Sequence, residues 1–166
     1  SGRAEGPLIG GLLNRLVRIQ ATPFALSPER FDGAILFWEE VGTNTPAVWN
    51  DLHVLRLAGM LDRIAGMVVG TTEVELAEGP DTLREVVLDV LGERDIPVLG
   101  NVDVGHDPPN LPMPLGVRAE MDADAKRFLR DKAVHGWEIV DGTARLCAMN
   151  LLLHGIGTAA VDSLVT

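Results

Sequence analysis

Short apolar runs alternate with helically spaced apolar residues along the first three quarters of this chain. Three runs are bounded by charges, proline or glycine and are short enough to be buried strands: 34–38, 64–69 and 96–99. Between them, residues 46–60 and 80–91 place apolar side chains on one side of a helix: Val48, Leu52, Leu55, Leu57, and then Leu83, Val86, Val87, Val90, Leu91. Gly59 is expected to end the first of these helices, and Pro80-Asp81 to open the second.

The two ends of this pattern are less regular. Residues 10–20 predict a short helix that follows a Gly-Gly turn. Residues 100–114 hold four prolines and two glycines in 15 positions, which predicts a stiff loop. A closing strand is expected over 115–121 and a charged helix over 122–135.

Strands that alternate with helices favour an α/β fold. We expect a single compact domain with a short, mostly parallel sheet, or a swivelling β/α barrel-like core, with helices packed on it. Reactive side chains of such sheets gather beyond the carboxyl ends of the strands. Glu39 follows the run 34–38 and His106 lies in the loop after 96–99, which makes these two the candidate site residues.

Composition narrows the function classes. The chain has 166 residues, 46% of them hydrophobic, which suits a globular protein with its own core. Its net charge of −10 argues against a nucleic-acid partner, because such binding depends on clustered Lys and Arg. No apolar run reaches the roughly 18 residues of a membrane span. We therefore expect a soluble, cytoplasmic protein that binds neither nucleic acid nor membrane.

Charge is distributed unevenly and divides the chain in two. Residues 1–124 hold 9 basic and 20 acidic side chains, a balance of −11, whereas 125–166 hold 5 and 4, a balance of +1. Both lysines, Lys126 and Lys132, belong to the second part. The break predicts two segments of different origin, 1–124 and 125–166.

A carboxylate beside a histidine has a defined chemical use. It holds the imidazole in one tautomer and stabilises the imidazolium, while the other ring nitrogen takes a proton from a nucleophile. Glu39 and His106 could form this pair, although a glutamate at a strand end is more often simply solvated. The nucleophile is harder to find, because the only serines are Ser1, Ser27 and Ser163 and none stands in a catalytic turn.

Five ordered blocks of residues 3–124 resemble the serine carboxypeptidases that include the LD-carboxypeptidases of murein recycling and the microcin C immunity peptidases. The blocks are Glu5-Gly6-Pro7-Leu8-Ile9-Gly10-Gly11, Phe31-Asp32-Gly33-Ala34-Ile35-Leu36-Phe37-Trp38-Glu39-Glu40, Leu57-Ala58-Gly59-Met60-Leu61, Ile64-Ala65-Gly66-Met67-Val68-Val69-Gly70, and Gly105-His106 with Leu111-Pro112-Met113-Pro114-Leu115-Gly116. The resemblance concerns the C-terminal domain of that family.

This resemblance implies a Ser-Glu-His triad in which Glu39 orients His106, with Glu40 the less suitable neighbour. The family's serine lies in a Gly-x-Ser-Asp turn of an N-terminal domain, which this sequence does not contain, and the usual Gly-Gly-Asn-Leu here reads Gly10-Gly11-Leu12-Leu13. An oxyanion hole and a substrate-carboxylate anchor would come from that domain as well. We expect the chain alone to be inactive on a peptide or murein fragment.

Residues 126–166 are instead similar to the modification (methyltransferase) subunits of type I restriction enzymes. That similarity implies a ribose ligand for S-adenosylmethionine at Glu138 and an adenine-side contact at Asp162. The glycine-rich cofactor loop and the Asn-Pro-Pro-aromatic motif are absent, so we expect no bound cofactor. The segment would instead complete the fold as a strand-helix-strand unit, with the junction near 122–128, and Cys147 would be a buried thiol.

Three hypotheses follow. The chain is part of a carboxypeptidase, or a recombined or engineered chimera that serves only as a folding scaffold, or a module that binds S-adenosylmethionine. His53, His135 and His154 lack the spacing of metal ligands, so no metal is expected. A surface left open where a serine-bearing domain would pack would favour a homodimer.

Overall fold

The computed structural model describes residues 2–75, 82–106, 108 and 110–123. By its internal contacts the chain divides into two units, residues 1–121 and 122–166. The elements described below build the first unit. The expected helix over 122–135, the strand-helix-strand segment after it and Cys147 fall almost wholly outside the described residues.

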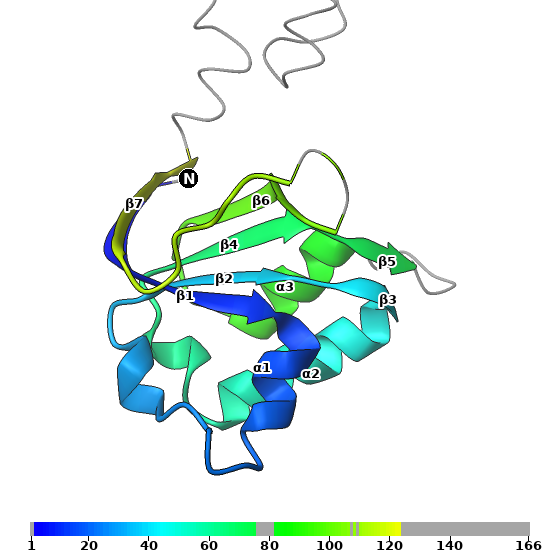
Figure 1. Ribbon diagram of the computed structural model, residues 1–166, viewed down its shortest axis with the longest axis horizontal. Helices are drawn as coiled ribbons and strands as arrows, with labels where there is room; N and C mark the ends of the chain where they lie inside the picture. Colours follow the sequence, from blue (N-terminus) through cyan, green and yellow to red (C-terminus); the bar gives the residue numbers. More distant parts are fainter. Residues whose placement is uncertain (1, 76–81, 107, 109, 124–166) are drawn as a thin grey trace, which may run out of the picture. The chain divides into compact units, whose positions relative to one another are not determined.

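A mostly parallel sheet of five strands is the centre of this unit, and it curls toward one edge (Figure 1). In the order β6-β4-β2-β1-β7 its strands are Val98–Gly105, Gly66–Thr71, Ile35–Glu39, Arg3–Leu12 and Arg118–Asp122. The first four are parallel neighbours, so their carboxyl ends meet at one edge of the sheet. Two short parallel strands, β3 (Val41–Asn44) and β5 (Glu73–Glu75), extend beyond that edge as a separate pair.

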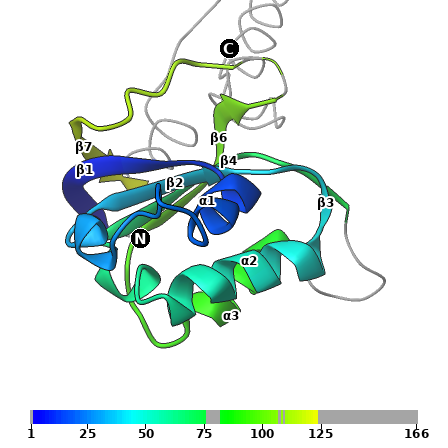
Figure 2. The ribbon, with the colours of Figure 1, turned by 60° about the horizontal axis from the view of Figure 1, so that its bottom comes forward.

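Three helices cover one face of the sheet: α1 (Leu13–Ile19), α2 (Thr45–Leu57) and α3 (Leu83–Leu91). Helices α2 and α3 run side by side beneath it (Figure 2). Single 3₁₀ turns at Pro28–Phe31 and Leu61–Arg63 lead toward β2 and β4. Thr82 caps α3, because its hydroxyl accepts the backbone N–H of Glu85 while the Glu85 carboxylate accepts that of Thr82.

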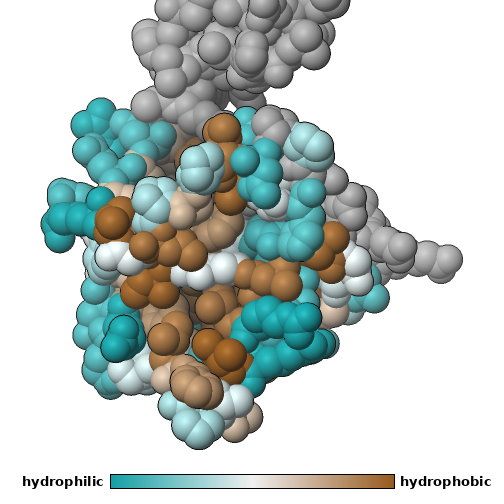
Figure 3. Space-filling view, in the orientation of Figure 1, coloured by the Kyte–Doolittle hydropathy of each residue, from teal (hydrophilic) through white to brown (hydrophobic). Residues whose placement is uncertain are grey.

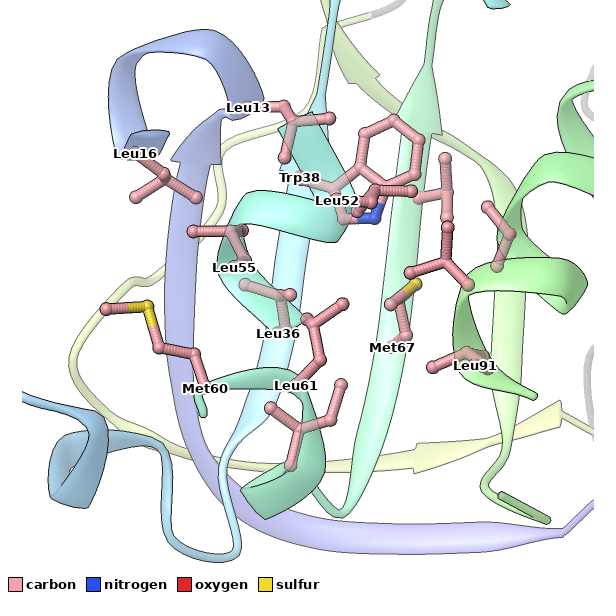
Figure 4. Packing of buried hydrophobic residues seen from close by; sticks show 14 of the residues in the cluster. Leu13, Leu16, Leu36, Trp38, Leu52, Leu55, Met60, Leu61, Met67 and Leu91 are labelled. Carbon is pink, nitrogen blue, oxygen red and sulfur yellow. The ribbon is translucent and has the colours of Figure 1, made fainter. Parts of the chain in front are cut away.

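Alternation along the strands divides the core into two layers. Leu36 and Trp38 of β2 point to the helices and pack with side chains of α1, α2 and α3 around Met67 (Figure 4). Ile35 and Phe37 point to the opposite face, which the β1, β6 and β7 strands help to cover. All five residues of β2 are buried, as expected for a central parallel strand.

The expected α/β architecture is confirmed, and so are strands close to 34–38 and 64–69 and helices close to 46–60 and 80–91. Within α2, however, Leu57 is exposed whereas Val48, Leu52 and Leu55 are buried. A helix turns about 200° between Leu55 and Leu57, so the two side chains lie on opposite sides. Assigning Leu57 to the buried stripe was wrong.

The prediction of a helix over 10–20 after a glycine turn was wrong at its start. Gly10 and Gly11 belong to β1, and α1 begins only at Leu13. The reason is the close approach of β1 to β2: a Cβ atom on Gly10 would lie 1.7 Å from the carbonyl oxygen of Phe37. Glycine here allows two backbones to meet and does not mark a turn.

The loop expected over 100–114 was also wrong in its first part. Strand β6 continues to Gly105, with register shifts against β4 between Val68 and Thr71 and with Asn101 at a φ of 53°. An irregular strand of this kind tolerates glycine and asparagine at its bulges. The last strand starts later than expected, at Arg118, and includes Asp122.

Large apolar side chains also reach the surface of the part of the chain that the structure describes, and Figure 3 shows hydrophobic residues on the face seen in Figure 1. The exposed ones are Phe24, Trp49, Val54, Leu57, Leu88, Leu111, Leu115 and Val117. None of the described helices combines the length and the apolar character that crossing a membrane requires.

Candidate active site

Glu39 is the last residue of β2, at the carboxyl edge of the sheet. It shares a face with Ile35 and Phe37, because side chains of a strand alternate. That face lies opposite the helices. The Glu39 side chain is only 10% exposed, so its carboxylate is held against the protein rather than free in solvent.

His106 follows the last residue of β6 at the same edge of the sheet, and it shares the face of Val104, two positions earlier. Its side chain is 53% exposed. Backbone contacts shape the loop that carries it: the Gly105 N–H donates to Asn110 Oδ1 at 3.3 Å, and the Leu111 N–H donates to the Asp103 carbonyl at 2.8 Å. These bonds turn the chain back on itself just after His106.

The structure brings the two predicted residues together: His106 Nδ1 lies 3.0 Å from Glu39 Oε2. An ionised carboxylate can only accept, so the proton of this hydrogen bond belongs to Nδ1. Nε2 is then the nitrogen that can take a proton from a nucleophile. A glutamate in contact with a half-exposed histidine is an arrangement in which the imidazole can take a proton from a nucleophile.

Strand β4 separates β2 from β6, so the pair must reach across it. The crossing point is Gly70, where an added Cβ would lie 3.0 Å from Glu39 Cβ and 2.2 Å from the carbonyl oxygen of Val104. Gly105 is under a similar constraint, because its φ is 155° and a Cβ would lie 2.5 Å from the Thr71 carbonyl oxygen. Two glycines thus permit the Glu39–His106 contact.

Gly70→Ala is expected to destabilise the domain by about 1–3 kcal/mol, the usual cost of forcing extra volume into a packed site. It should also displace Glu39 from His106, because the new methyl group lies against both β6 and Glu39. Urea unfolding and the imidazole NMR spectrum would measure the two effects. Gly100→Ala is the matched control, since no atom lies within 4 Å of a Cβ there; equal effects from both substitutions would contradict the prediction.

Glu40, the less suitable neighbour, points the other way and is 1% exposed. Its Oε2 accepts the backbone N–H of Asn14 at 2.8 Å, and its Oε1 accepts Asn14 Nδ2 at 2.8 Å and the Val41 N–H at 3.1 Å. Asn14 lies in the first turn of α1, where backbone N–H groups lack helical partners. Glu40 is therefore engaged inside the protein and does not face His106.

Asp51 of α2 lies near Glu40 and is partly buried. Burial raises the pKa of Asp51 above its usual 3.8, the charge of Glu40 raises it further, and Arg18 opposes both. A carboxyl group whose pKa is raised in the folded state binds its proton more tightly there than in the unfolded state. Its contribution to the free energy of unfolding is therefore full below the ordinary aspartate pKa and is lost as the pH rises through the raised pKa.

Asp51→Asn is accordingly expected to increase the free energy of unfolding at pH 7, because it removes a charge that the folded state holds unfavourably. The gain should shrink as the pH falls through the raised pKa and should be lost below the ordinary aspartate range of about 4, where Asp51 is protonated in both states. Urea unfolding of both proteins at several pH values measures it. A loss of stability at pH 7 would mean that the attraction to Arg18 outweighs burial.

Ser27 cannot complete the pair from its present place. It precedes the 3₁₀ turn at Pro28–Phe31, before β2, and so lies toward the amino end of the strand whose carboxyl end carries Glu39. Ser1 and Ser163 lie outside the described residues, and so do the two residues expected near a methyl donor, Glu138 and Asp162. Within the described ranges no three His, Cys, Asp or Glu side chains gather as metal ligands would.

Sequence reasoning missed several residues that shape the site. Gly70 ended a predicted strand and gave no sign that Glu39 would lean over it. Asn110 was one polar residue among prolines, although asparagine in a loop often accepts a nearby backbone N–H. Asn14 fell within the helix predicted over 10–20 and was given no role, yet its bonds to Glu40 join segments 26 positions apart.

Comparison with known proteins places residues 5–121 of this chain in a family. The family described as LD-carboxypeptidase C-terminal domain matches residues 5–121. A second one, described as N-6 DNA methylase, matches residues 117–165. Among curated proteins, the microcin C7 self-immunity protein of Escherichia coli is 34% identical over 129 residues, which are 77% of this chain and 37% of that protein. The probable murein peptide carboxypeptidase of Bacillus subtilis is 30% identical over 137 residues, 80% of this chain and 42% of its own length.

Solved structures agree with the sequences. A microcin C7 self-immunity protein in its wild-type apo state superposes with a TM-score of 0.69 at 32% identity, over 75% of this chain and 37% of that one. The muramoyltetrapeptide carboxypeptidase of Oxalobacter formigenes gives 0.62 at 28% identity, over 72% and 42%. This chain thus spans about two fifths of the length of these relatives. Through residues 5–121 it belongs to the family of LD-carboxypeptidase C-terminal domains.

Proposed function

We propose that this chain supplies the glutamate and the histidine of a Ser-Glu-His carboxypeptidase centre, with Glu39 as the orienting carboxylate and His106 as the general base. The observation that carries the proposal is the 3.0 Å contact between Glu39 Oε2 and His106 Nδ1 at the carboxyl edge of a parallel sheet. The serine, the oxyanion hole and the anchor for the substrate carboxylate would come from a serine-bearing domain. The chain by itself should not cleave peptides.

The names of its relatives support a peptide substrate. One is a probable murein peptide carboxypeptidase and another a muramoyltetrapeptide carboxypeptidase. The half-exposed imidazole also fits this role, because a general base must be reached by the hydroxyl whose proton it takes. We infer a substrate that ends in a free carboxylate, a murein-type tetrapeptide being the first to try.

The test is to restore the serine. Residues 1–124 are fused behind the N-terminal region of the Bacillus subtilis relative, where the family resemblance predicts the serine. Release of the terminal amino acid from a murein-type tetrapeptide is then followed. The fusion should hydrolyse the peptide, whereas the chain alone should not. His106→Gln in the fusion should abolish turnover, because the glutamine amide cannot take the proton of the serine.

Two results would contradict the proposal. A folded fusion that binds the peptide but does not cleave it would mean that the Glu39–His106 pair is inherited without function. Turnover that survives His106→Gln would place the base elsewhere. Circular dichroism and thermal unfolding of the fusion and its variant separate both outcomes from misfolding.

A chimeric scaffold is the second candidate, and the match of residues 117–165 to N-6 DNA methylases favours it. In this alternative residues 125–166 derive from a methyltransferase and complete the fold of 1–124 without catalysis or cofactor binding. Removing residues 125–166 would then strongly destabilise the chain. Binding of S-adenosylmethionine through Glu138 and Asp162 is the third possibility, and calorimetry at millimolar cofactor without heat would exclude it.

A further inference from the structure

Glu40 forms a second, internal site directly beside the candidate catalytic carboxylate. It is a 1% exposed carboxyl group, and its described hydrogen bonds come from Asn14 and Val41 rather than from a lysine or an arginine. Burying a carboxylate is costly unless its oxygens are fully bonded. Three N–H donors meet them here, two from Asn14 and one from Val41.

These bonds connect two places that matter for Glu39. Leu12, the last residue of β1, pairs in register with Glu39, and Asn14 follows two positions later. Glu40 thus ties the point where β1 becomes α1 to the point where β2 ends. The backbone N–H of Val41, which follows the end of β2, donates to the same carboxylate.

We propose that Glu40 is a positioning residue for Glu39: by binding Asn14 and Val41 it fixes the end of β2, so that the Glu39 carboxylate points across Gly70 to His106. Side chains alternate at the end of the strand, so anchoring Glu40 on the helix side directs Glu39 to the opposite face. This inference rests on the proposed function, because it assigns Glu40 a purpose within that site.

The chemistry of glutamine provides the test. All three hydrogen-bond partners of Glu40 are donors. In Glu40→Gln an NH₂ group replaces one carboxylate oxygen, so this NH₂ must face an N–H group that the oxygen had accepted. The strand end should then shift while the side chain keeps its size. The readout is the imidazole NMR spectrum of His106, assigned with His106→Gln, in which the hydrogen bond to Glu39 gives a protonated Nδ1.

Glu40→Gln should lose the Nδ1 proton resonance of His106 and shift the ring nitrogens toward a mixture of tautomers. Asn14→Ala, which removes only the side-chain donor, should cause a smaller shift and serves if Glu40→Gln does not fold. The exchanged pair Glu40→Gln with Asn14→Asp should recover part of the wild-type spectrum, because the introduced glutamine amide then donates to the introduced aspartate carboxylate while the Val41 N–H still meets a donor.

Arg94→Met is the control for a purely structural role. Arg94 donates to the carbonyl oxygens of Leu61 and Ile64, before β4 and far along the strand from Glu39. It should lower the melting temperature and leave the His106 spectrum unchanged. The inference would be overturned if Glu40→Gln lowered the melting temperature and left the His106 spectrum unchanged. If Glu40→Gln does not fold, an unchanged His106 spectrum in Asn14→Ala would overturn it.

The spectrum is measured on this chain without any serine-bearing domain. Failure of the fusion to cleave peptides would therefore count against the proposed function and leave the inference about Glu40 to its own test. If the fusion is active, Glu40→Gln should lower kcat up to about 10²-fold with little change in KM, the loss typical of a misplaced catalytic group.

Discussion

Glu39→Gln in the serine-bearing fusion is expected to lower kcat by about 10³–10⁴-fold with little change in KM. Glutamine has the shape of glutamate but no charge, so it cannot stabilise the imidazolium that forms when His106 takes the proton of the serine. Its amide can also present N–H to Nδ1, which favours the wrong tautomer. Steady-state kinetics on the murein-type tetrapeptide would measure the loss.

The matched control is Glu93→Gln, the same chemical change at an exposed residue just after α3, at the opposite end of the sheet. It should leave kcat and KM unchanged. If Glu39→Gln retained most of the activity, the contact between Glu39 and His106 would be structural, and the carboxylate of the triad would have to come from elsewhere.

Gly10→Ala should have the largest effect on stability. Its new methyl group would lie 1.7 Å from the Phe37 carbonyl oxygen and 2.5 Å from the Phe37 carbonyl carbon, both of them backbone atoms that no side-chain rotation can move. Relief requires β1 to separate from β2 in the middle of the sheet. We expect a cost at or above the upper end of the usual range of about 1–3 kcal/mol for overpacking.

Urea unfolding of the soluble fraction measures this cost, and the amount of protein that remains soluble on expression gives a second reading. Gly100→Ala makes the same change in β6 where nothing lies within 4 Å, and it should be tolerated. A Gly10→Ala protein as stable as the wild type would mean that β1 and β2 are further apart than the structure has them.

Part of the fold could be predicted because burial leaves a local mark. The run Ile35 to Trp38 is apolar on both faces, as a central parallel strand must be, and the first charge after it marks the carboxyl end. Together with the rule that such ends carry reactive groups, this was enough to select Glu39 and His106. Their assignment to a triad came from the family resemblance and remains a prediction.

Other features depend on contacts that no local pattern records. Gly10 looks like a turn residue, and only the neighbouring strand explains it. Gly70 must be small because Glu39 leans over it, and that requires knowing that β4 lies between β2 and β6. The hydrogen bonds between Glu40 and Asn14 connect residues that are far apart in the sequence, so no local pattern indicates them. Glu138 and Asp162 lie outside the described residues, so their assignments stay predictions.

The order of the strands affects the fraction of time for which Glu39 and His106 are in contact. Glu39 ends a strand with neighbours on both sides, whereas His106 follows β6, the edge strand, which is held to the sheet through β4. Edge elements open locally at a lower free energy than the centre of a domain. His106 can therefore move away with β6 while the Glu39 carboxylate stays in place. The lifetime of the Glu39–His106 contact is then set by local opening of β6 rather than by global unfolding, and hydrogen exchange measures that opening.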